Sequence, residues 1–155
     1  MPSPLSPKER PRIAFVIASV LVLSVCSFAA LGGDVNSVVA DQAHMKAQRR
    51  VSQTTAYALH EMQDANGVVV REFVSSQGKV FGVAWEGPSR PDLQQVLGAY
   101  YAQFTKNAPA RRAHGPMTIQ VPGFVLQSGG HQRALSGRAY VPEMVPAGVS
   151  AEEIK

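Results

Sequence analysis

The chain has 155 residues, a net charge of +4 at pH 7 and a single cysteine, and 45% of its residues are hydrophobic. One cysteine excludes a disulfide framework within the chain, and this length suits one compact domain. The basic residues stand singly or as two adjacent pairs, Arg49 with Arg50 and Arg111 with Arg112. Because they form no stripe, the charge pattern predicts no nucleic-acid partner.

The first 30 residues predict an export signal. Three basic side chains come first, at Lys8, Arg10 and Arg12. An uncharged apolar run follows over residues 13–28, and Ser27 and Ala29 suit cleavage before Ala30. We therefore expect a signal peptide over residues 1–29 and a periplasmic or secreted protein.

Two other interpretations of the leader stay open. The uncharged stretch over residues 13–31 is long enough to cross a bilayer as an uncleaved anchor. The segment Leu23-Ser24-Val25-Cys26 resembles a lipobox, although Val25 stands where such boxes have Gly, Ala or Ser. Positive charge before the run keeps the N-terminus inside, so the folded part lies outside the cytoplasm in every case, and the anchored form would face the periplasm from the inner membrane.

Cleavage would leave a chain that packing alone must stabilise. Removing residues 1–29 takes away Cys26 and leaves 4 Lys and 8 Arg against 4 Asp and 6 Glu, a net charge of +2. We expect a single α+β domain over residues 30–141 and an extended C-terminal tail over residues 142–155, with a helical turn capped by Ser150 and Glu153.

The first half of this domain predicts a short helix and a three-strand meander. Ser37 suits the cap of a helix that runs to about Gln48. Three strands are expected at residues 55–62, 68–75 and 79–86, separated by turns at Asp64-Ala65-Asn66-Gly67 and Gln77-Gly78.

The register between the second and third of these strands has two solutions. A two- or four-residue loop places one set of side chains together: Val70, Glu72, Val74, Phe81, Val83 and Trp85. A three-residue loop places Val69, Arg71 and Phe73 on the aromatic face and leaves Glu72 beside Val80, Gly82 and Ala84. In both, a charge from Arg71 or Glu72 enters an apolar face and needs a partner there.

The second half predicts one amphipathic helix and a hairpin. Ser89 suits the helix cap, with Asp92 completing a capping box, and an apolar stripe follows: Leu93, Val96, Leu97, Tyr100, Tyr101 and Phe104. The side chains expected to face outward are Gln94, Gln95, Ala99 and Gln103. After a mobile loop over residues 107–116, residues 117–127 predict one strand interrupted at Pro122-Gly123, which turns at residues 128–130 and pairs with a strand over residues 133–141. The fold class is therefore α+β, with a small antiparallel sheet of a three-strand meander plus a C-terminal hairpin, packed by one amphipathic helix.

Several segments together resemble a family of small exported Gram-negative bacterial proteins classed only as a domain of unknown function. These segments are Leu31-Gly32-Gly33, Asp41, Arg71-Glu72-Phe73-Val74, residues 80–88, Pro91-Asp92-Leu93, Leu97-Gly98 and residues 137–142. The resemblance covers nearly all of the chain after the leader. It implies export and a single domain, and it implies no activity or cofactor. Phe73 and Gly82 stand where the family often has Tyr and Ala.

Motifs for metal or nucleophilic chemistry are lacking in the sequence. His60-Glu61-Met62-Gln63-Asp64 has an acid where a zinc-protease motif needs its second histidine, and it falls on a predicted strand. There is no Gly-x-Ser-x-Gly elbow, phosphate loop or calcium loop. We expect no metal site, no cofactor and no catalytic residue.

One constellation remains as a candidate ligand-binding site: Arg71, Glu72, Trp85, Glu86, Asp92 and Arg138. An arginine paired with Glu72 would satisfy a charge in a half-buried sheet, and Asp92 already serves a helix cap, so a structural role is the stronger interpretation. The sequence favours a non-catalytic binding or accessory module with an exported or envelope protein as partner, which contacts the membrane only through an uncleaved leader. The alternative is a small hydrolase or isomerase that uses a carboxylate and arginine pocket.

Overall fold

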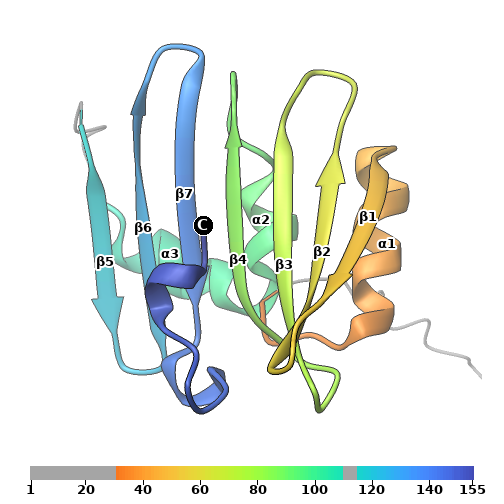
Figure 1. The fold of residues 1–155 in the computed structure, drawn as a ribbon. Helices are drawn as coiled ribbons and strands as arrows, with labels where there is room; N and C mark the ends of the chain where they lie inside the picture. The colour runs from red at the N-terminus through yellow and green to blue at the C-terminus, as the bar shows by residue number, and fades with distance from the viewer. Residues whose placement is uncertain (1–30, 110–114) are drawn as a thin grey trace, which may run out of the picture.

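The computed structural model describes residues 31–109 and 115–155, which form one seven-stranded antiparallel sheet with helices on one face. The strand order is β1-β2-β3-β4-β7-β6-β5 (Figure 1). The strands are β1 (Gln48–Gln53), β2 (Tyr57–Gln63), β3 (Val69–Ser75), β4 (Val80–Gly87), β5 (Met117–Val121), β6 (Phe124–His131) and β7 (Ala134–Tyr140). The predicted α+β class is confirmed, but the sheet is larger than the predicted meander and hairpin. The predicted leader over residues 1–29 and the middle of the predicted loop, residues 110–114, lie outside the described residues.

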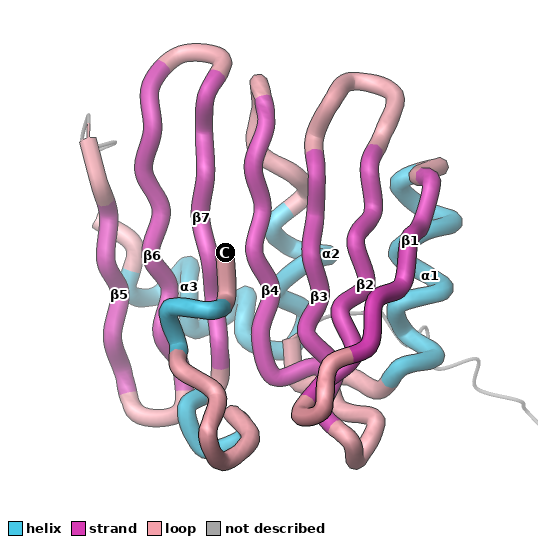
Figure 2. The backbone as a smooth tube through the Cα atoms, viewed as in Figure 1, coloured by secondary structure: helices cyan, strands magenta, loops and turns pink. Residues whose placement is uncertain are grey.

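The helices cover one face of the sheet, and the C-terminal tail covers part of the other. The helical elements behind the sheet are α1 (Val35–Met45), α2 (Leu93–Leu97), η1 (Gly98–Tyr100) and α3 (Tyr101–Asn107). The tail holds two single-turn 3-10 helices, η2 (Pro142–Met144) and η3 (Ala151–Glu153), which lie in front of the strands (Figure 2). The described residues contain no helix that is both long and apolar enough for a membrane span.

The predicted meander is present as β2, β3 and β4, with one additional strand before it. Residues 48–53 read Gln-Arg-Arg-Val-Ser-Gln and are mostly exposed, because β1 is an edge strand that pairs with β2 alone. Because these residues are polar, the strand lacks the apolar alternation that would predict it from the sequence. Two arginines on an edge also discourage pairing with other chains.

The observed register is close to the first of the two predicted solutions. Val70 lies opposite Trp85 and Glu72 opposite Val83, so these side chains share the helical face. The pairing shifts between Phe73 and Val74, which moves Phe81 to the opposite face, against Phe73. As predicted, a charged residue enters the apolar face: Glu72 is completely buried.

Two predicted helix starts were wrong by three residues. Asp34, rather than Ser37, caps α1 by accepting from the backbone N–H groups of Asn36 and Ser37. Asp92, rather than Ser89, caps α2 by accepting from those of Gln94 and Gln95. An ionised aspartate beside the free N–H groups is favoured by both the hydrogen bonds and the helix dipole.

The predicted continuous helix after Asp92 is broken. Gly98 adopts φ 48° and ψ −119°, a conformation that ends α2 and leaves a 3-10 turn before α3. Glycine alone among the residues takes this backbone shape at little cost. The apolar stripe still faces the sheet, but from two short helices at an angle.

The predicted interrupted strand is in fact two strands. Pro122 and Gly123, with φ 74° at the glycine, turn the chain so that β5 and β6 pair with each other as a hairpin. β6 continues through the predicted turn at residues 128–130 to His131, and the chain reverses at Gln132 and Arg133. The C-terminal half of the sheet is therefore a three-strand meander.

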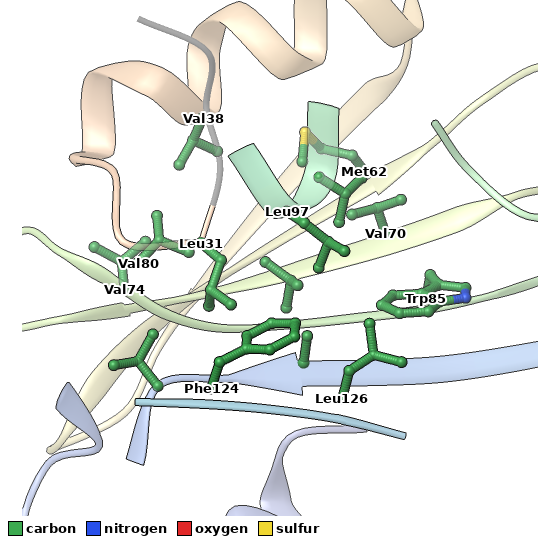
Figure 3. Close-up of a cluster of buried hydrophobic side chains, with 14 of the residues drawn as sticks. Leu31, Val38, Met62, Val70, Val74, Val80, Trp85, Leu97, Phe124 and Leu126 are labelled. Carbon is green, nitrogen blue, oxygen red and sulfur yellow. The ribbon is translucent and has the colours of Figure 1, made fainter. Parts of the chain in front are cut away.

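The main core lies between the sheet and the helices (Figure 3). Trp85, Leu97, Phe124 and Leu126 are among its fully buried side chains. A smaller core lies under the tail and contains Phe73, Phe81, Ala84 and Ile154. Ile154 has no exposed surface, and the predicted capping box of Ser150 and Glu153 begins η3 just before it. The tail is therefore packed onto the sheet at its end.

Candidate functional site

A row of polar side chains crosses the face of the sheet that the tail partly covers. Arg71 on β3 lies opposite Ala84 on β4, and Ala84 lies opposite Arg138 on β7. The row continues to Gln127 on β6 and Thr118 on β5. The backbones of Arg71 and Arg138 are therefore about 10 Å apart, which is two strand spacings, with Ala84 between them.

Small residues in this row and the next leave a groove of about 400 Å³. The groove is lined by Arg71, Trp85, Glu86, Pro116, Met117, Thr118, Gln127, Ser128, Gly129, Ser136, Gly137, Arg138, Ile154 and Lys155. Side chains alternate between the faces of a strand, so Trp85 points to the helical core and borders the groove with its backbone. We call this hollow the arginine groove.

Arg71 is held in place by two carboxylates. Its Nε donates to Glu61 Oε2 at 2.8 Å and its Nη2 to Glu86 Oε1 at 2.7 Å. Partial burial lowers the pKa of Arg71, but the hydrogen bonds and charges of Glu86 and Glu61 outweigh it and raise that pKa above its ordinary value. The guanidinium is thus a fixed positive charge whose Nη1 donates to none of the described side chains.

Arg138 has polar partners but no charged one. Its Nε donates to Gln127 Oε1 and its Nη1 to the carbonyl oxygen of Ala151, both at 2.8 Å. Within residues 31–109 and 115–155, no side-chain carboxylate lies within 4 Å of this guanidinium. Its positive charge is therefore available to a ligand, and its side chain also fastens the tail to β7.

The structure divides the six predicted site residues into three groups. Arg71, Trp85, Glu86 and Arg138 border the arginine groove. Glu72 is buried on the opposite face of the sheet, and Asp92 caps α2. Glu61 and Gln127, which orient the two arginines, are not among the residues predicted from the sequence, because their role depends on cross-strand register rather than on sequence spacing.

Glu72 belongs to a second polar cluster between the sheet and the helices. It faces Asp41 of α1, and Gln95 of α2 donates from Nε2 to Asp41 Oδ1. The exposed fractions are 0% for Glu72, 1% for Asp41 and 6% for Gln95, which was predicted to face outward. Gln95 turns inward and supplies Asp41 with a hydrogen-bond donor from α2. We call these three residues the buried carboxyl cluster.

Burial dominates the acid–base properties of this cluster. It raises the pKa of Asp41 to about 6, although hydrogen bonds with Glu72 and Gln95 act to lower it. Burial also raises the pKa of Glu72 well above its usual range, and the hydrogen bond and charge of Asp41 raise it further. His60, cross-strand from Glu72, has its pKa lowered by burial and by the charge of Arg49.

Among the described residues, no group of three or more His, Cys, Asp or Glu side chains is placed to hold a metal ion. A hollow of about 610 Å³ between α1 and α2 has Asp34 and Asp92 on its wall, but both carboxylates already cap helices. Gln95 also lines this hollow, so only one side chain separates it from Asp41.

Comparison with known families decides the classification of the chain. The family model for a protein of unknown function, DUF2844, matches residues 27–154. The chain belongs to the DUF2844 family. No curated protein matches the chain, and neither does any solved structure. The match spans both the arginine groove and the buried carboxyl cluster, so both sites lie within the DUF2844 domain.

Proposed function

We propose that this DUF2844 protein is a non-catalytic binding module of the cell envelope that holds an anionic ligand in the arginine groove. The observation that carries the proposal is Arg138, a groove-lining guanidinium with no carboxylate partner among the described residues. Guanidinium groups bind carboxylates and phosphates through strong, charge-assisted hydrogen bonds.

The charge of the groove supports an anion. Arg71, Arg138 and Lys155 contribute three positive side chains, against the carboxylate of Glu86 in the lining and that of Glu61, which is bonded to Arg71. These groups together carry a net charge of +1. Ala84, between the two arginines, is buried with Ile154 of the tail, so an anionic group would approach the guanidinium groups from the part of the groove lined by Gly129 and Ser136. Hydroxyl groups of Thr118 and Ser136 line the same hollow and add neutral hydrogen-bonding groups.

The arrangement favours binding over chemistry. Glu86, the groove carboxylate, is already bonded to Arg71 at 2.7 Å. The two acids that do face each other, Asp41 and Glu72, are at most 1% exposed and lie on the other face of the sheet. A hydrolase or isomerase needs an acid and a base that both reach the substrate, and the paired or buried state of these described carboxyl groups supports a binding role instead.

Binding of an anionic probe tests the proposal. The purified protein is titrated with 1-anilinonaphthalene-8-sulfonate, a fluorescent anion, and with the same probe in rising salt. We expect the wild type to bind the probe saturably and more weakly as the salt concentration rises. Arg138→Met and Arg71→Met should each lower the affinity about tenfold or more, because a hydrogen bond to a charged group contributes about 1.5 to 3 kcal/mol.

The matched control is Arg90→Met, which removes an exposed arginine outside the arginine groove. It should bind the probe like the wild type, and circular dichroism should show that all three variants are folded. Equal affinity in the wild type and both groove variants would disprove the proposed site, as would an equal loss in the Arg90 variant.

We further propose that the protein works outside the cytoplasm beside an exported or envelope protein partner. The support is the basic and apolar leader of residues 1–29. Mass spectrometry of the protein isolated from an envelope fraction should find a mature form that begins at Ala30. A full-length form found only in the cytosol would contradict both the location and the partner class.

A further inference from the structure

Three carboxylate oxygens of the buried carboxyl cluster have no hydrogen-bond donor other than the carboxyl group that faces them. They are Asp41 Oδ2, Glu72 Oε1 and Glu72 Oε2. Two carboxylates that face each other in a buried site cannot both be ionised at an acceptable cost. One proton between Asp41 and Glu72 removes most of this cost, because the protonated acid then donates to the carboxylate.

The donor from α2 decides where that proton resides. Gln95 Nε2 donates to Asp41 Oδ1, and a side-chain amide N–H group stabilises an ionised acceptor. Asp41 is therefore the carboxylate of the pair, and Glu72 is the acid that donates to it. In this arrangement the pair joins α1, β3 and α2 through one chain of hydrogen bonds.

Other charged groups modify the pair from several elements. His44 on α1 acts on Asp41 with a favourable charge, whereas Asp92 at the start of α2 acts unfavourably. Arg49 on β1 acts favourably on ionised Glu72. His60 on β2 lies opposite Glu72 and has an unpartnered Nδ1. None of these groups forms an ion pair with Asp41 or Glu72.

The attachment of α1 to the sheet depends heavily on this pair. α1 buries only three residues, Ser37, Val38 and Asp41, and two of them are polar. Val35 and Val39, its other valines, are 38% and 52% exposed. Val38 and the partly buried Met45 would be the main apolar contacts left to hold α1 if Asp41 and Glu72 repelled each other.

We propose that Asp41 and Glu72 form a pH-sensitive latch: one shared proton fastens α1 to β3, and loss of that proton to solvent detaches α1 while the rest of the sheet stays folded. Gln95 lines the hollow between α1 and α2 and bonds to Asp41, so the pair lies one side chain away from this hollow. The latch is independent of the arginine groove, which lies on the other face.

Hydrogen exchange followed by mass spectrometry tests the latch. Protection of residues 35–45 is compared with that of β3 and β4 between pH 6.5 and 9, after correction for the intrinsic exchange rate. We expect protection of α1 in the wild type to fall by up to about tenfold for each pH unit and to drop below that of β3 and β4, whose exchange requires global unfolding. In Glu72→Gln the amide can still donate to Asp41, so α1 should stay protected throughout.

Two further variants complete the test. Asp41→Asn removes the charge that faces Glu72 but leaves Glu72 buried, so it should weaken the pH dependence without abolishing it. This variant serves if Glu72→Gln does not fold. Glu143→Gln changes an exposed glutamate on η2 and should behave like the wild type. Constant protection of α1 in the wild type would overturn the proposal, as would a fall that persists without Glu72 or an α1 protection that never drops below that of β3 and β4.

Discussion

Replacing Gly137 with Ala is expected to lower the free energy of unfolding by about 3 kcal/mol, the upper range for overpacking a core. A Cβ atom at this position would overlap the ring of Trp85 on one side and lie 3.0 Å from the carbonyl oxygen of Gln127 on the other. Trp85 is 2% exposed and packed in the main core, so it cannot move away cheaply. Urea denaturation measures the loss.

A double variant tests whether the loss of stability comes from this overlap with Trp85 or from any substitution in β7. Trp85→Phe shortens the ring at the contact, so the double variant with Gly137→Ala should be more stable than the sum of the two single losses allows. Gly129→Ala is the matched control, because its Cβ would meet only ordinary contacts with Pro116, at 3.8 Å. Strict additivity in the double variant would rule out the overlap as the cause.

The second large expected effect is a fall in the free energy of unfolding as the pH rises, caused by Asp41 and Glu72. In the unfolded chain Asp41 and Glu72 ionise near their ordinary pKa values of 3.8 and 4.5, whereas in the folded protein burial raises the pKa of Asp41 to about 6 and that of Glu72 further above its own. The folded state therefore holds more protons. The stabilisation from these protons is complete below about pH 4. It is lost as the pH rises through 6 and on to the pKa of Glu72. The free energy of unfolding then falls by about 1.4 kcal/mol per pH unit for each proton.

His60 sets the lowest pH at which urea denaturation can test this prediction. Burial lowers its pKa below 6.5, so the unfolded chain binds a proton there that the folded protein does not, and stability rises with pH in that window. This opposing effect is half gone at pH 6.5 and is over by about pH 7.5. Urea denaturation between pH 6.5 and 9 should show falling stability in the wild type and a flatter profile in Glu72→Gln. Equal slopes in the two proteins would show that Glu72 is not the titrating group.

The local patterns in the sequence predicted the elements better than their connections. The three strands of β2, β3 and β4 were found from alternation and turn residues, and the entry of a charge beside Trp85 followed from the adjacency of Arg71 and Glu72. β1 was missed because an exposed edge strand has no apolar pattern. The β5–β6 hairpin was missed because Pro122-Gly123 is equally compatible with a break and with a turn.

The candidate sites show the same division. Arg71, Glu86 and Arg138 were selected from the sequence as charges on strands, and the register of β3, β4 and β7 brings them to one groove. Glu72 was grouped with them by sequence proximity, but neighbouring residues on a strand point to opposite faces. Its actual partner, Asp41, is 31 positions earlier, and no local pattern relates the two.

The sequence by itself determined the α+β class, the central strands and the need for a partner to a buried charge, because each depends on residues close together along the chain. Only the tertiary structure decided which charges meet. Strand order and helix docking bring distant residues together, and the free energy of a buried carboxyl group depends on those neighbours rather than on its own place in the sequence.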